Sequence, residues 1–219
     1  MRYADRVRGV FVTFEGVEGV GKSTQISLAA ERLRARSIEP LVTREPGGTP
    51  LAEQLRTLVL EHGHGDVGAT AELLLMFAAR ASHVTDIIRP ALAAGRCVLC
   101  DRFTDATEAY QGGGRGVDGA VIRQLAAIAH PGLSPDLTIV FDVPATVANA
   151  RLAGRGSGND RIESEDAQFF ERVRKAYLAI AAREPDRVRI VDATRTEADV
   201  AADVAGLIDA ALAKGGVHG

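Results

Sequence analysis

The stretch of sequence that decides the fold of this chain is Gly16-Val17-Glu18-Gly19-Val20-Gly21-Lys22-Ser23. One glycine, four residues and then Gly-Lys-Ser is the spacing of a P-loop, which wraps the phosphates of a nucleotide. Its glycines reach backbone conformations that are closed to other residues, so that successive N–H groups can surround an anion. In such a loop Lys22 reaches the β- and γ-phosphates, and the hydroxyl of Ser23 binds Mg²⁺.

The segments on either side of this loop have the patterns that a P-loop requires. Residues 10–14 are a short β-branched and aromatic run, which predicts a strand that enters the loop. After Ser23, apolar residues recur at helical spacing, among them Ile26, Ala29 and Leu33. An ordinary glycine turn between a strand and a helix is the alternative, but the Lys-Ser pair and both flanks favour a site for a nucleoside triphosphate.

Length and composition restrict the class of protein. The 219 residues suit a single domain, 1–219, and 46% hydrophobic residues are enough for a core. The net charge of −3 argues against a nucleic-acid partner, whose recognition needs a basic face. No apolar run approaches membrane-spanning length and no hydrophobic signal segment opens the chain, so we expect no membrane association and a cytoplasmic location.

The two cysteines, Cys97 and Cys100, have the C-x-x-C spacing of some redox and zinc sites. They lie in a buried-strand pattern, however, where residues three apart point to opposite faces of a sheet. A redox pair needs a helix N-terminus, and a zinc site needs further ligands. We therefore expect two buried structural thiols.

Strand-like runs alternate with helical periodicity along the chain. Further strands are predicted at residues 41–43, 97–100, 137–141 and 188–191, and helices at 50–61, 70–94, 121–129, 145–152, 167–182 and 197–213. This alternation predicts an α/β fold with a five-stranded parallel sheet and helices on both faces. Ligands of such folds collect beyond the carboxyl ends of the strands. A glycine- and arginine-rich segment, 151–161, interrupts the helical pattern and is a candidate mobile lid.

Polar motifs follow several of the predicted strands. Asp101 and Arg102 close the third strand, where an aspartate beside a P-loop strand is expected to hold Mg²⁺ directly or through water. Residues 43–49 place Arg and Glu before a Pro-Gly-Gly turn, and residues 109–116 place Tyr and Gln before a glycine-rich bend. Each could be a plain turn or loop, but the strand-end position favours a role at the substrate.

Three arginines, Arg151, Arg155 and Arg161, lie in the candidate lid. Guanidinium groups stabilise the charge that spreads over a phosphoryl group during transfer, once a closing segment excludes water. A solvated basic helix end is the alternative for each of them.

Together these stretches resemble the bacterial thymidylate kinases, a family of P-loop kinases of nucleoside monophosphates. The resemblance is carried by residues 14–24, 43–49 (TREPGGT), 101–103 (DRF), 109–116 (AYQGGGRG) and a closing Val191-Asp192-Ala193. It covers nearly the whole chain, in order. It implies a P-loop kinase fold with a lid at about 151–163, and ATP- and Mg²⁺-dependent conversion of dTMP to dTDP in dTTP biosynthesis by a homodimer.

The resemblance also assigns roles to matching positions. Glu18 corresponds to the acidic P-loop residue that contacts the sugar 3′-hydroxyl, and Arg102 to the arginine that holds the acceptor phosphate. Tyr110 matches the aromatic residue that crowds the sugar 2′ position. Gln111 and Thr107 match positions that face the thymine edge. The remaining substrate positions are Arg80 at the base, Arg56 near the acceptor, and Glu45 with Pro46, which in relatives follows a cis peptide.

One position departs from the family pattern. Relatives commonly place a phenylalanine that stacks on the base four residues before the arginine matched by Arg80, where this chain has Met76. Phe77 lies three residues before, and positions three and four apart share a helix face. Either could cover the thymine ring, and we favour Phe77 because an aromatic face stacks best on a flat base.

The nucleotide side is implied in the same way. Some thymidylate kinases carry a catalytic arginine within the P-loop, but none lies there in this chain, so Arg155, together with Arg151, is expected to supply the transition-state charge beside Lys22 and Arg102. Arg151 also resembles the arginine that lies against adenine. The expected ATP positions are Gly16, Val17, Glu18, Gly19, Val20, Gly21, Lys22, Ser23, Thr24, Arg151 and Ala193, with Ser23 and Asp101 at the metal.

Two other functions are compatible with a P-loop. A P-loop kinase of a different nucleoside monophosphate is the nearest alternative, and substrate competition separates the two. A nucleotide-dependent switch of the GTPase kind needs an Asn-Lys-x-Asp signal for guanine, which the sequence lacks.

Overall fold

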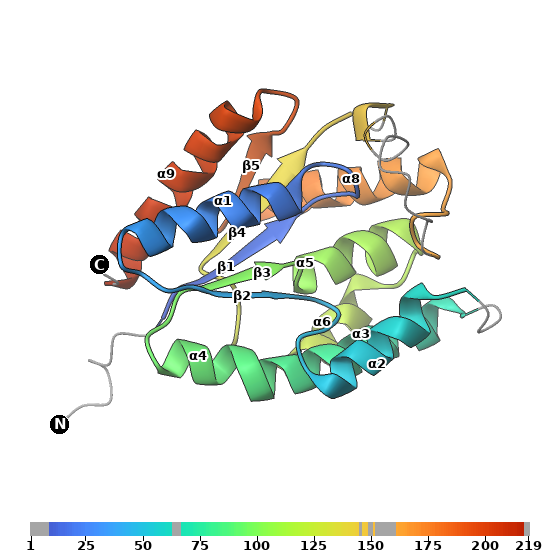
Figure 1. Ribbon diagram of the computed structural model, residues 1–219. Coiled ribbons are helices and arrows are strands. Elements are labelled where there is room, and N and C mark those ends of the chain that lie inside the picture. Colours follow the sequence, from blue (N-terminus) through green and yellow to red (C-terminus); the bar gives the residue numbers. More distant parts are fainter. Residues whose placement is uncertain (1–8, 63–66, 145, 149–150, 152–160, 217–219) are drawn as a thin grey trace.

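The computed structural model describes residues 9–62, 67–144, 146–148, 151 and 161–216. In this part of the chain, five strands form one parallel sheet in the order β2-β3-β1-β4-β5 (Figure 1). The strands are β1 (Phe11–Glu15), β2 (Leu41–Arg44), β3 (Val98–Asp101), β4 (Leu137–Asp142) and β5 (Val188–Asp192). The predicted five-stranded parallel α/β sheet is confirmed. Each strand ends one residue later than predicted, because the polar residue after each apolar run still belongs to the sheet.

Most helices follow the predicted segments closely, but α5 (Thr104–Thr107) was not predicted, and the predicted helix at 145–152 lies partly outside the described residues. They are α1 (Lys22–Ala35), α2 (Pro50–Leu60), α3 (Ala69–His83), α4 (Arg89–Ala93), α5 (Thr104–Thr107), α6 (Gly119–Ala129), α8 (Ala167–Arg183) and α9 (Glu197–Gly215). Two π-helical segments, η1 (Val84–Ile88) and η2 (Glu108–Gly114), join α3 to α4 and extend α5. The predicted helix at 70–94 is therefore one continuous run of α3, η1 and α4. Among the described residues, none of the helices is both long and apolar enough to cross a membrane.

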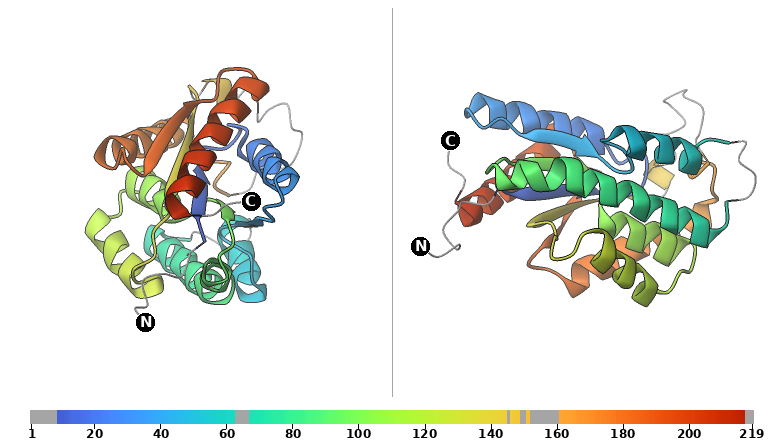
Figure 2. Two further views of the ribbon diagram at one scale, coloured as in Figure 1. Left: turned by 90° about the vertical axis from the view of Figure 1, so that its left-hand side faces the viewer. Right: turned by 90° about the horizontal axis from the view of Figure 1, so that it is seen from below.

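Helices cover both faces of the sheet, with α1 and α8 on opposite sides (Figure 2). Side chains alternate along β1: Val12 and Phe14 belong to the cluster that contains the α1 residues, whereas Phe11 packs with η1 and α4. The same alternation separates the cysteines, since Cys97 lies in the first cluster and Cys100 in the second. Both thiols are buried and free, as predicted, and burial with nearby Asp136 raises the pKa of Cys97 to about 12.

The segment at 109–116 differs from its prediction as a glycine-rich bend. Most of it is the π-helical η2, and helix α8 lies directly against it. A Cβ atom at Gly114 would come 2.4 Å from the ring of Phe169, and one at Gly113 would come 2.6 Å from the Cβ of Ala176. These glycines therefore permit a close helix contact and do not form an open turn.

Register brings the functional motifs to one edge of the sheet. Phe14 on β1 and Arg44 on β2 both pair with Asp101 on β3, so the three strands end at the same level. Because parallel strands share the direction of their carboxyl ends, the loops that follow them meet there. The P-loop, the Glu45–Pro46 turn and the Asp101-Arg102 motif are thus neighbours.

Candidate active site

The P-loop has the backbone that its sequence predicts. It runs from the end of β1 at Glu15 to the start of α1 at Lys22, and Gly16, Gly19 and Gly21 have positive φ angles of 134°, 78° and 93°. A Cβ atom at Gly16 would come 2.7 Å from the carbonyl oxygen of Phe141 on β4. Glycine is therefore required at this position both for its φ angle and for space.

Lys22 is folded back on this loop. Its Nζ donates hydrogen bonds to the carbonyl oxygens of Gly16, at 3.0 Å, and Val17, at 2.9 Å. Burial, assisted by the positive charge of Arg102, lowers the pKa of Lys22 to about 8. An anion at the loop would favour the charged form of this ammonium group, so the site is electrostatically suited to a phosphate.

A cavity of about 280 Å³ lies beside the P-loop and the start of α9, and we call it the P-loop cavity. It is lined by Gly19, Val20, Gly21, Thr24, Gln25, Arg151, Ala193, Arg195, Glu197 and Val200. Arg151 donates from Nη2 to the carbonyl oxygen of Ala193 at 2.9 Å, so these two predicted positions are in contact. No recognisable sequence motif predicts the lining residues Gln25, Arg195 and Glu197.

A second cavity, the Arg102 cavity, has the P-loop residue Glu18 in its wall. Its lining consists of Glu18, Glu45, Pro46, Arg56, Leu60, Met76, Arg102, Ala106, Tyr110, Gln111 and Ile162. Eight of these were predicted substrate residues, although they come from separate elements of the chain. Arg56 donates from Nη1 to the carbonyl oxygen of Pro46 at 2.9 Å, and the Glu45–Pro46 peptide is cis.

Arg102 is the centre of a polar network in this cavity. Its Nη2 donates to Oε1 of Glu18 at 2.6 Å and to the hydroxyl of Tyr110 at 3.0 Å, and the Tyr110 hydroxyl donates to Oε2 of Glu18 at 2.6 Å. The guanidinium also lies 4.7 Å from the centre of the Tyr110 ring. Although burial acts to raise it, the pKa of Glu18 is lowered by Arg102 and Lys22. Arg102 itself has a φ of 71°, a strained conformation for a non-glycine residue.

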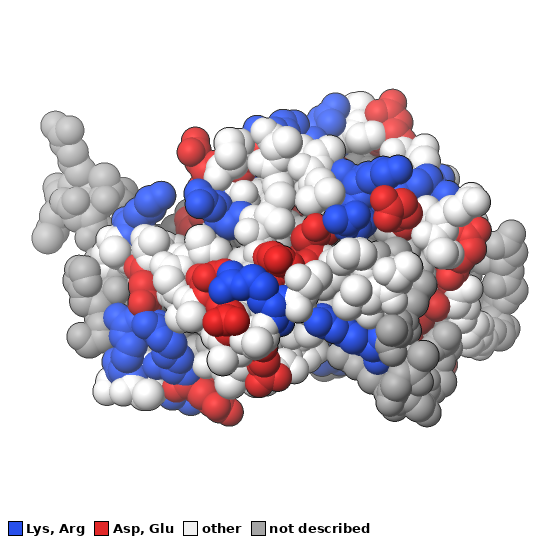
Figure 3. All heavy atoms as spheres, turned by 90° about the horizontal axis from the view of Figure 1, so that it is seen from above, with Lys and Arg blue, Asp and Glu red and all other residues white. Residues whose placement is uncertain are grey.

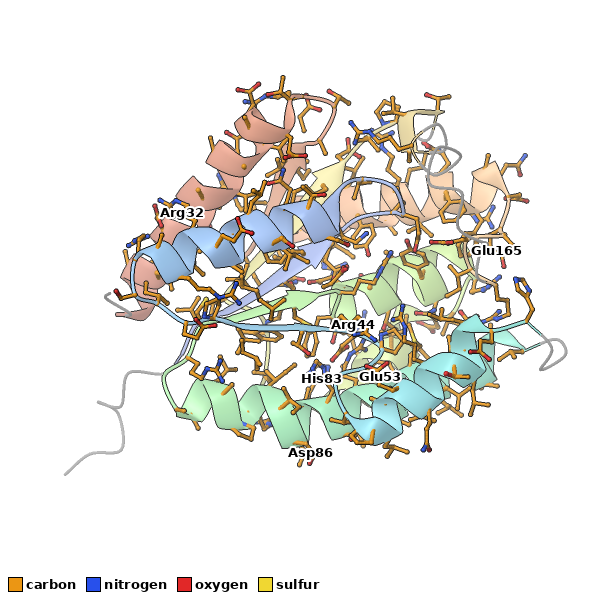
Figure 4. All side chains as sticks on the ribbon, in the orientation of Figure 1. Arg32, Arg44, Glu53, His83, Asp86 and Glu165 are labelled. Atoms are coloured by element: carbon orange, nitrogen blue, oxygen red, sulfur yellow. The ribbon has the colours of Figure 1, made fainter. Side chains whose placement is uncertain are left out.

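A second network surrounds Glu45. Its Oε2 accepts from Nε of Arg80 at 2.6 Å, and its Oε1 lies 3.0 Å from Nδ1 of His83. Burial opposes ionisation of this carboxyl, but Arg80 and His83 outweigh it and lower its pKa. His83 also forms a hydrogen bond with Thr43 on β2. The next residue of β2, Arg44, forms an exposed ion pair with Glu53 on α2 (Figure 4).

Three buried polar atoms near this cavity have no hydrogen-bond partner in the described structure. They are Nη1 of Arg80, Oε1 of Gln111 and Oγ1 of Thr107. Arg80 uses its other nitrogens on Glu45 and on the carbonyl oxygen of Phe103, and Gln111 uses Nε2 on Glu72. Because buried polar groups are normally satisfied, one free donor and two oxygens point to a polar ligand.

The structure separates the two candidate residues for stacking on a base. In the described part of the chain, Met76 lines the Arg102 cavity, whereas Phe77 is absent from its wall. Instead the Phe77 ring lies 4.9 Å from the guanidinium carbon of Arg80 and packs with Leu73 and Ile122. The preference for Phe77 therefore disagrees with this geometry, because the helix turns Phe77 toward α6.

The residues predicted to hold a metal suit Mg²⁺. Asp101 has a buried Oδ1 without a partner in the described structure, and Ser23 is exposed at the first turn of α1. Mg²⁺ prefers oxygen ligands, and in nucleotide sites it takes one or two from protein and the rest from phosphates and water. Among the described residues no group of three or more His, Cys, Asp or Glu is arranged to bind a metal, so these two positions would need a nucleotide to complete the site.

Not every predicted residue can be placed. Arg155 and residues 152–160 of the candidate lid lie outside the described residues. Arg161 is described, and it donates from Nε to the carbonyl oxygen of Val59 at 2.9 Å and forms an ion pair with Glu72. Within the described part of the chain, its polar partners thus lie on α2 and α3 and not on the P-loop.

Two buried residues of the site, Glu15 and Tyr177, are not predicted by any sequence motif. Glu15, at the end of β1, accepts hydrogen bonds from the backbone N–H of Phe103 and the hydroxyl of Tyr177, each at 2.7 Å. Burial, with a smaller effect of Asp105, raises the pKa of Glu15 to about 8. Tyr177 in turn lies 3.4 Å from Nη1 of Arg102. Glu15 follows the predicted first strand as a single polar residue, and Tyr177 lies within an amphipathic helix pattern. Neither position has a local signal, and only long-range contacts reveal the two residues.

Comparisons with known proteins agree with one another. A sequence model of the family described as thymidylate kinase matches residues 14–204. Thymidylate kinase from Ectopseudomonas mendocina is 52% identical over 204 residues, covering 93% of this chain and 97% of the relative, and that from Pseudomonas syringae pv. syringae is 54% identical over 194 residues, covering 89% and 92%. The crystal structure of thymidylate kinase from Ehrlichia chaffeensis has a TM-score of 0.72 and 33% identity, and the match covers 92% of this chain and 99% of that one. On these grounds, the chain belongs to the thymidylate kinase family.

Proposed function

We propose that this protein is a dTMP kinase that transfers the γ-phosphoryl group of ATP to dTMP and releases dTDP, a step of dTTP biosynthesis. The observation that carries the proposal is the position of Glu18. This P-loop residue bonds to both Arg102 and Tyr110, so the triphosphate loop and the Arg102 cavity share one wall. A donor nucleotide on the loop and an acceptor in the cavity would meet beside Glu18.

The charges of the site suit phosphoryl transfer between two anions. Lys22 and the loop amides would hold the β- and γ-phosphates, and Arg102 would hold the acceptor phosphate and bridge it to the donor. Mg²⁺, held by Ser23, Asp101 and the nucleotide, would neutralise part of the phosphate charge. No strong general base is needed, because the acceptor phosphate oxygen is already ionised near neutral pH. Alignment and charge neutralisation therefore supply the catalysis.

The walls of the Arg102 cavity support a pyrimidine deoxynucleotide as the acceptor. Glu18 would take the sugar 3′-hydroxyl, and Tyr110 would crowd the 2′ position. Arg56, Glu45 and Pro46 would enclose the acceptor side, and Met76 would cover the flat base. The free Nη1 of Arg80 and Oε1 of Gln111 are a donor and an acceptor, which complement O4 and N3–H of thymine, with Thr107 beside them.

The nucleotide side of the proposal rests on the P-loop cavity. Arg151 would lie against adenine beside Ala193, and Arg155 would supply transition-state charge from the lid at about 151–163 of the single domain 1–219. The same proposal includes a homodimer. Exposed Leu51, Leu58, Leu74 and Ile128, which lie on α2, α3 and α6, support an apolar contact between subunits.

ATP and small nucleotides would be the partners, in the cytoplasm, without nucleic acid. Basic and acidic side chains are interspersed over the face shown in Figure 3, which supports this proposal. A nucleic-acid site would instead need basic residues gathered on one face.

A coupled assay of ATP consumption tests the function. The protein and Mg²⁺-ATP are incubated separately with dTMP, dUMP, dCMP, CMP, UMP and dGMP. A clear preference for dTMP is expected. Preference for another monophosphate would favour a different nucleoside monophosphate kinase, and no turnover with any acceptor would refute the proposed reaction.

A further inference from the structure

We propose that Glu72, a buried glutamate of α3, is a positioning residue that sets base specificity by fixing which end of the Gln111 amide faces the Arg102 cavity. This inference rests on the proposed function, since it concerns the base of the acceptor. In the described structure Glu72 is not among the residues that line the cavity. It would act through Gln111 and touch no substrate.

The contact between the two side chains is direct and buried. Nε2 of Gln111 donates to Oε1 of Glu72 at 2.8 Å, and the exposed fractions are 0% for Gln111 and 1% for Glu72. Gln111 lies on η2, so the bond joins η2 to α3 beside the cavity. The other end of the amide, Oε1, is the end left without a partner.

Glu72 is held as a carboxylate. Arg115 donates to it at 3.3 and 3.4 Å, and Arg161 forms an ion pair with the same carboxylate. Burial acts to raise the pKa of Glu72, but the hydrogen bonds of Gln111 and Arg161 and the charges of Arg115 and Arg161 lower it overall. An ionised carboxylate only accepts hydrogen bonds, so it can face the NH₂ end of Gln111 but not the carbonyl end.

The consequence for the ligand follows from the free atoms. With its NH₂ group held by Glu72, Gln111 presents a carbonyl oxygen to the cavity wall, and Arg80 has a free N–H nearby. Thymine and uracil offer the complement, because N3–H donates and O4 accepts. Cytosine has the reverse pattern, with an acceptor at N3 and a donor at N4. If the Gln111 amide were reversed, its NH₂ group would face the base, and only Arg80 would still distinguish thymine and uracil from cytosine.

The experiment compares kcat/KM for dUMP and dCMP, two acceptors that differ only at the base edge. In the wild-type protein we expect dUMP to be preferred by about 100-fold or more, because a mismatched edge leaves buried polar groups unpaired. In Glu72→Gln the new amide can donate as well as accept a hydrogen bond. The side-chain amide of Gln111 can then rotate and bond to it through either end. The dUMP preference should then fall by about 10-fold, mainly through KM.

The matched control is Glu165→Gln. Among the described residues, Glu165 is the other carboxylate on Arg115, at 2.5 Å from its Nη1, and it forms no hydrogen bond with Gln111 there. The control removes one carboxylate from the same ion-pair cluster, and its dUMP preference should stay within about twofold of wild type. If weakening the ion-pair cluster were enough to change the dUMP preference, both variants would show the change. If Glu72 orients Gln111, only Glu72→Gln would show it.

A folded Glu72→Gln protein with an unchanged ratio of dUMP to dCMP would overturn the inference. If that variant does not fold, calorimetric binding of dUMP and dCMP to the wild-type protein decides instead. Equal affinities would mean that the Gln111 amide turns freely, which also overturns the inference. Absence of phosphorylation of any pyrimidine monophosphate, with dUMP still bound in preference to dCMP, would refute the proposed reaction and leave the role of Glu72 standing.

Discussion

Replacing Glu15 with glutamine is expected to stabilise the protein in mildly alkaline solution. Glu15 is fully buried, and its pKa is raised from an ordinary value of 4.5 to about 8. Between these two values the folded protein holds a proton on this carboxyl that the unfolded chain has lost. The free energy of unfolding of the wild-type protein must therefore fall as the pH rises toward 8.

The size of the effect follows from the two pKa values. Linkage gives a loss of about 2 kcal/mol in the free energy of unfolding between about pH 6 and pH 8 from this one group. For a chain of this length, that corresponds to roughly 4–8 °C in melting temperature. Glu15→Gln cannot titrate, yet its amide still offers an acceptor to the N–H of Phe103. The free energy of unfolding of this variant should therefore lack the pH-dependent loss that Glu15 causes.

The assay is urea or thermal unfolding of wild type and Glu15→Gln at several pH values over this range. Glu31→Gln, a change at an exposed position of α1, is the control and should follow the wild-type curve. The difference between Glu15→Gln and wild type should grow with pH in favour of the variant. Parallel curves for the two proteins would show that Glu15 is ionised in the folded state already at about pH 6 and would refute the reasoning.

Three further predictions concern the reaction. Arg102→Ala should lower kcat by at least about 100-fold and leave the calorimetric Kd for ATP within about twofold, because the proposed role of Arg102 is to hold the acceptor phosphate and bridge it to the donor. Wild-type turnover would remove Arg102 from the mechanism. Tyr110→Ala should raise the kcat/KM of UMP relative to dUMP by about 10-fold or more, whereas Tyr110→Phe keeps the ring and should change this ratio little. Equal ratios in both variants would contradict the proposal that the ring crowds the 2′ position of the sugar. A chelator should abolish turnover. Asp101→Asn should raise the half-saturating Mg²⁺ concentration by roughly 10-fold, measured by titration at fixed ATP. An unchanged Mg²⁺ requirement would exclude Asp101 from the metal site.

The sheet and most of its functional edge could be predicted because their signals are local. A β-branched run followed by Gly-x₄-Gly-Lys-Ser specifies strand, loop and helix within fifteen residues, and parallel order then brings Glu45 and Asp101 to the same edge. The strand ends were each one residue short, because polar residues such as Glu15 and Asp101 read as the start of a loop.

The parts that escaped prediction depend on contacts between distant segments. Glu72 meets Gln111 across 39 residues, and Glu15 meets Tyr177 across 162. A glutamate within an apolar helix pattern gives no local sign of such a partner. The prediction of a bend at the glycine run before Arg115 was wrong for a related reason. Glycine is needed there because of the Phe169 ring of α8 and not because the chain turns.

The wall of the Arg102 cavity also limits how its ligand preference can evolve. Most polar groups of the wall are locked together, so a change at Glu18, Glu45 or Arg102 disturbs several partners at once. Met76 forms no polar contact in the described structure, and a thioether side chain adapts its shape easily. Selection for acceptors with larger or smaller bases would therefore act first on the volume at position 76, which changes the pocket without breaking its charge network.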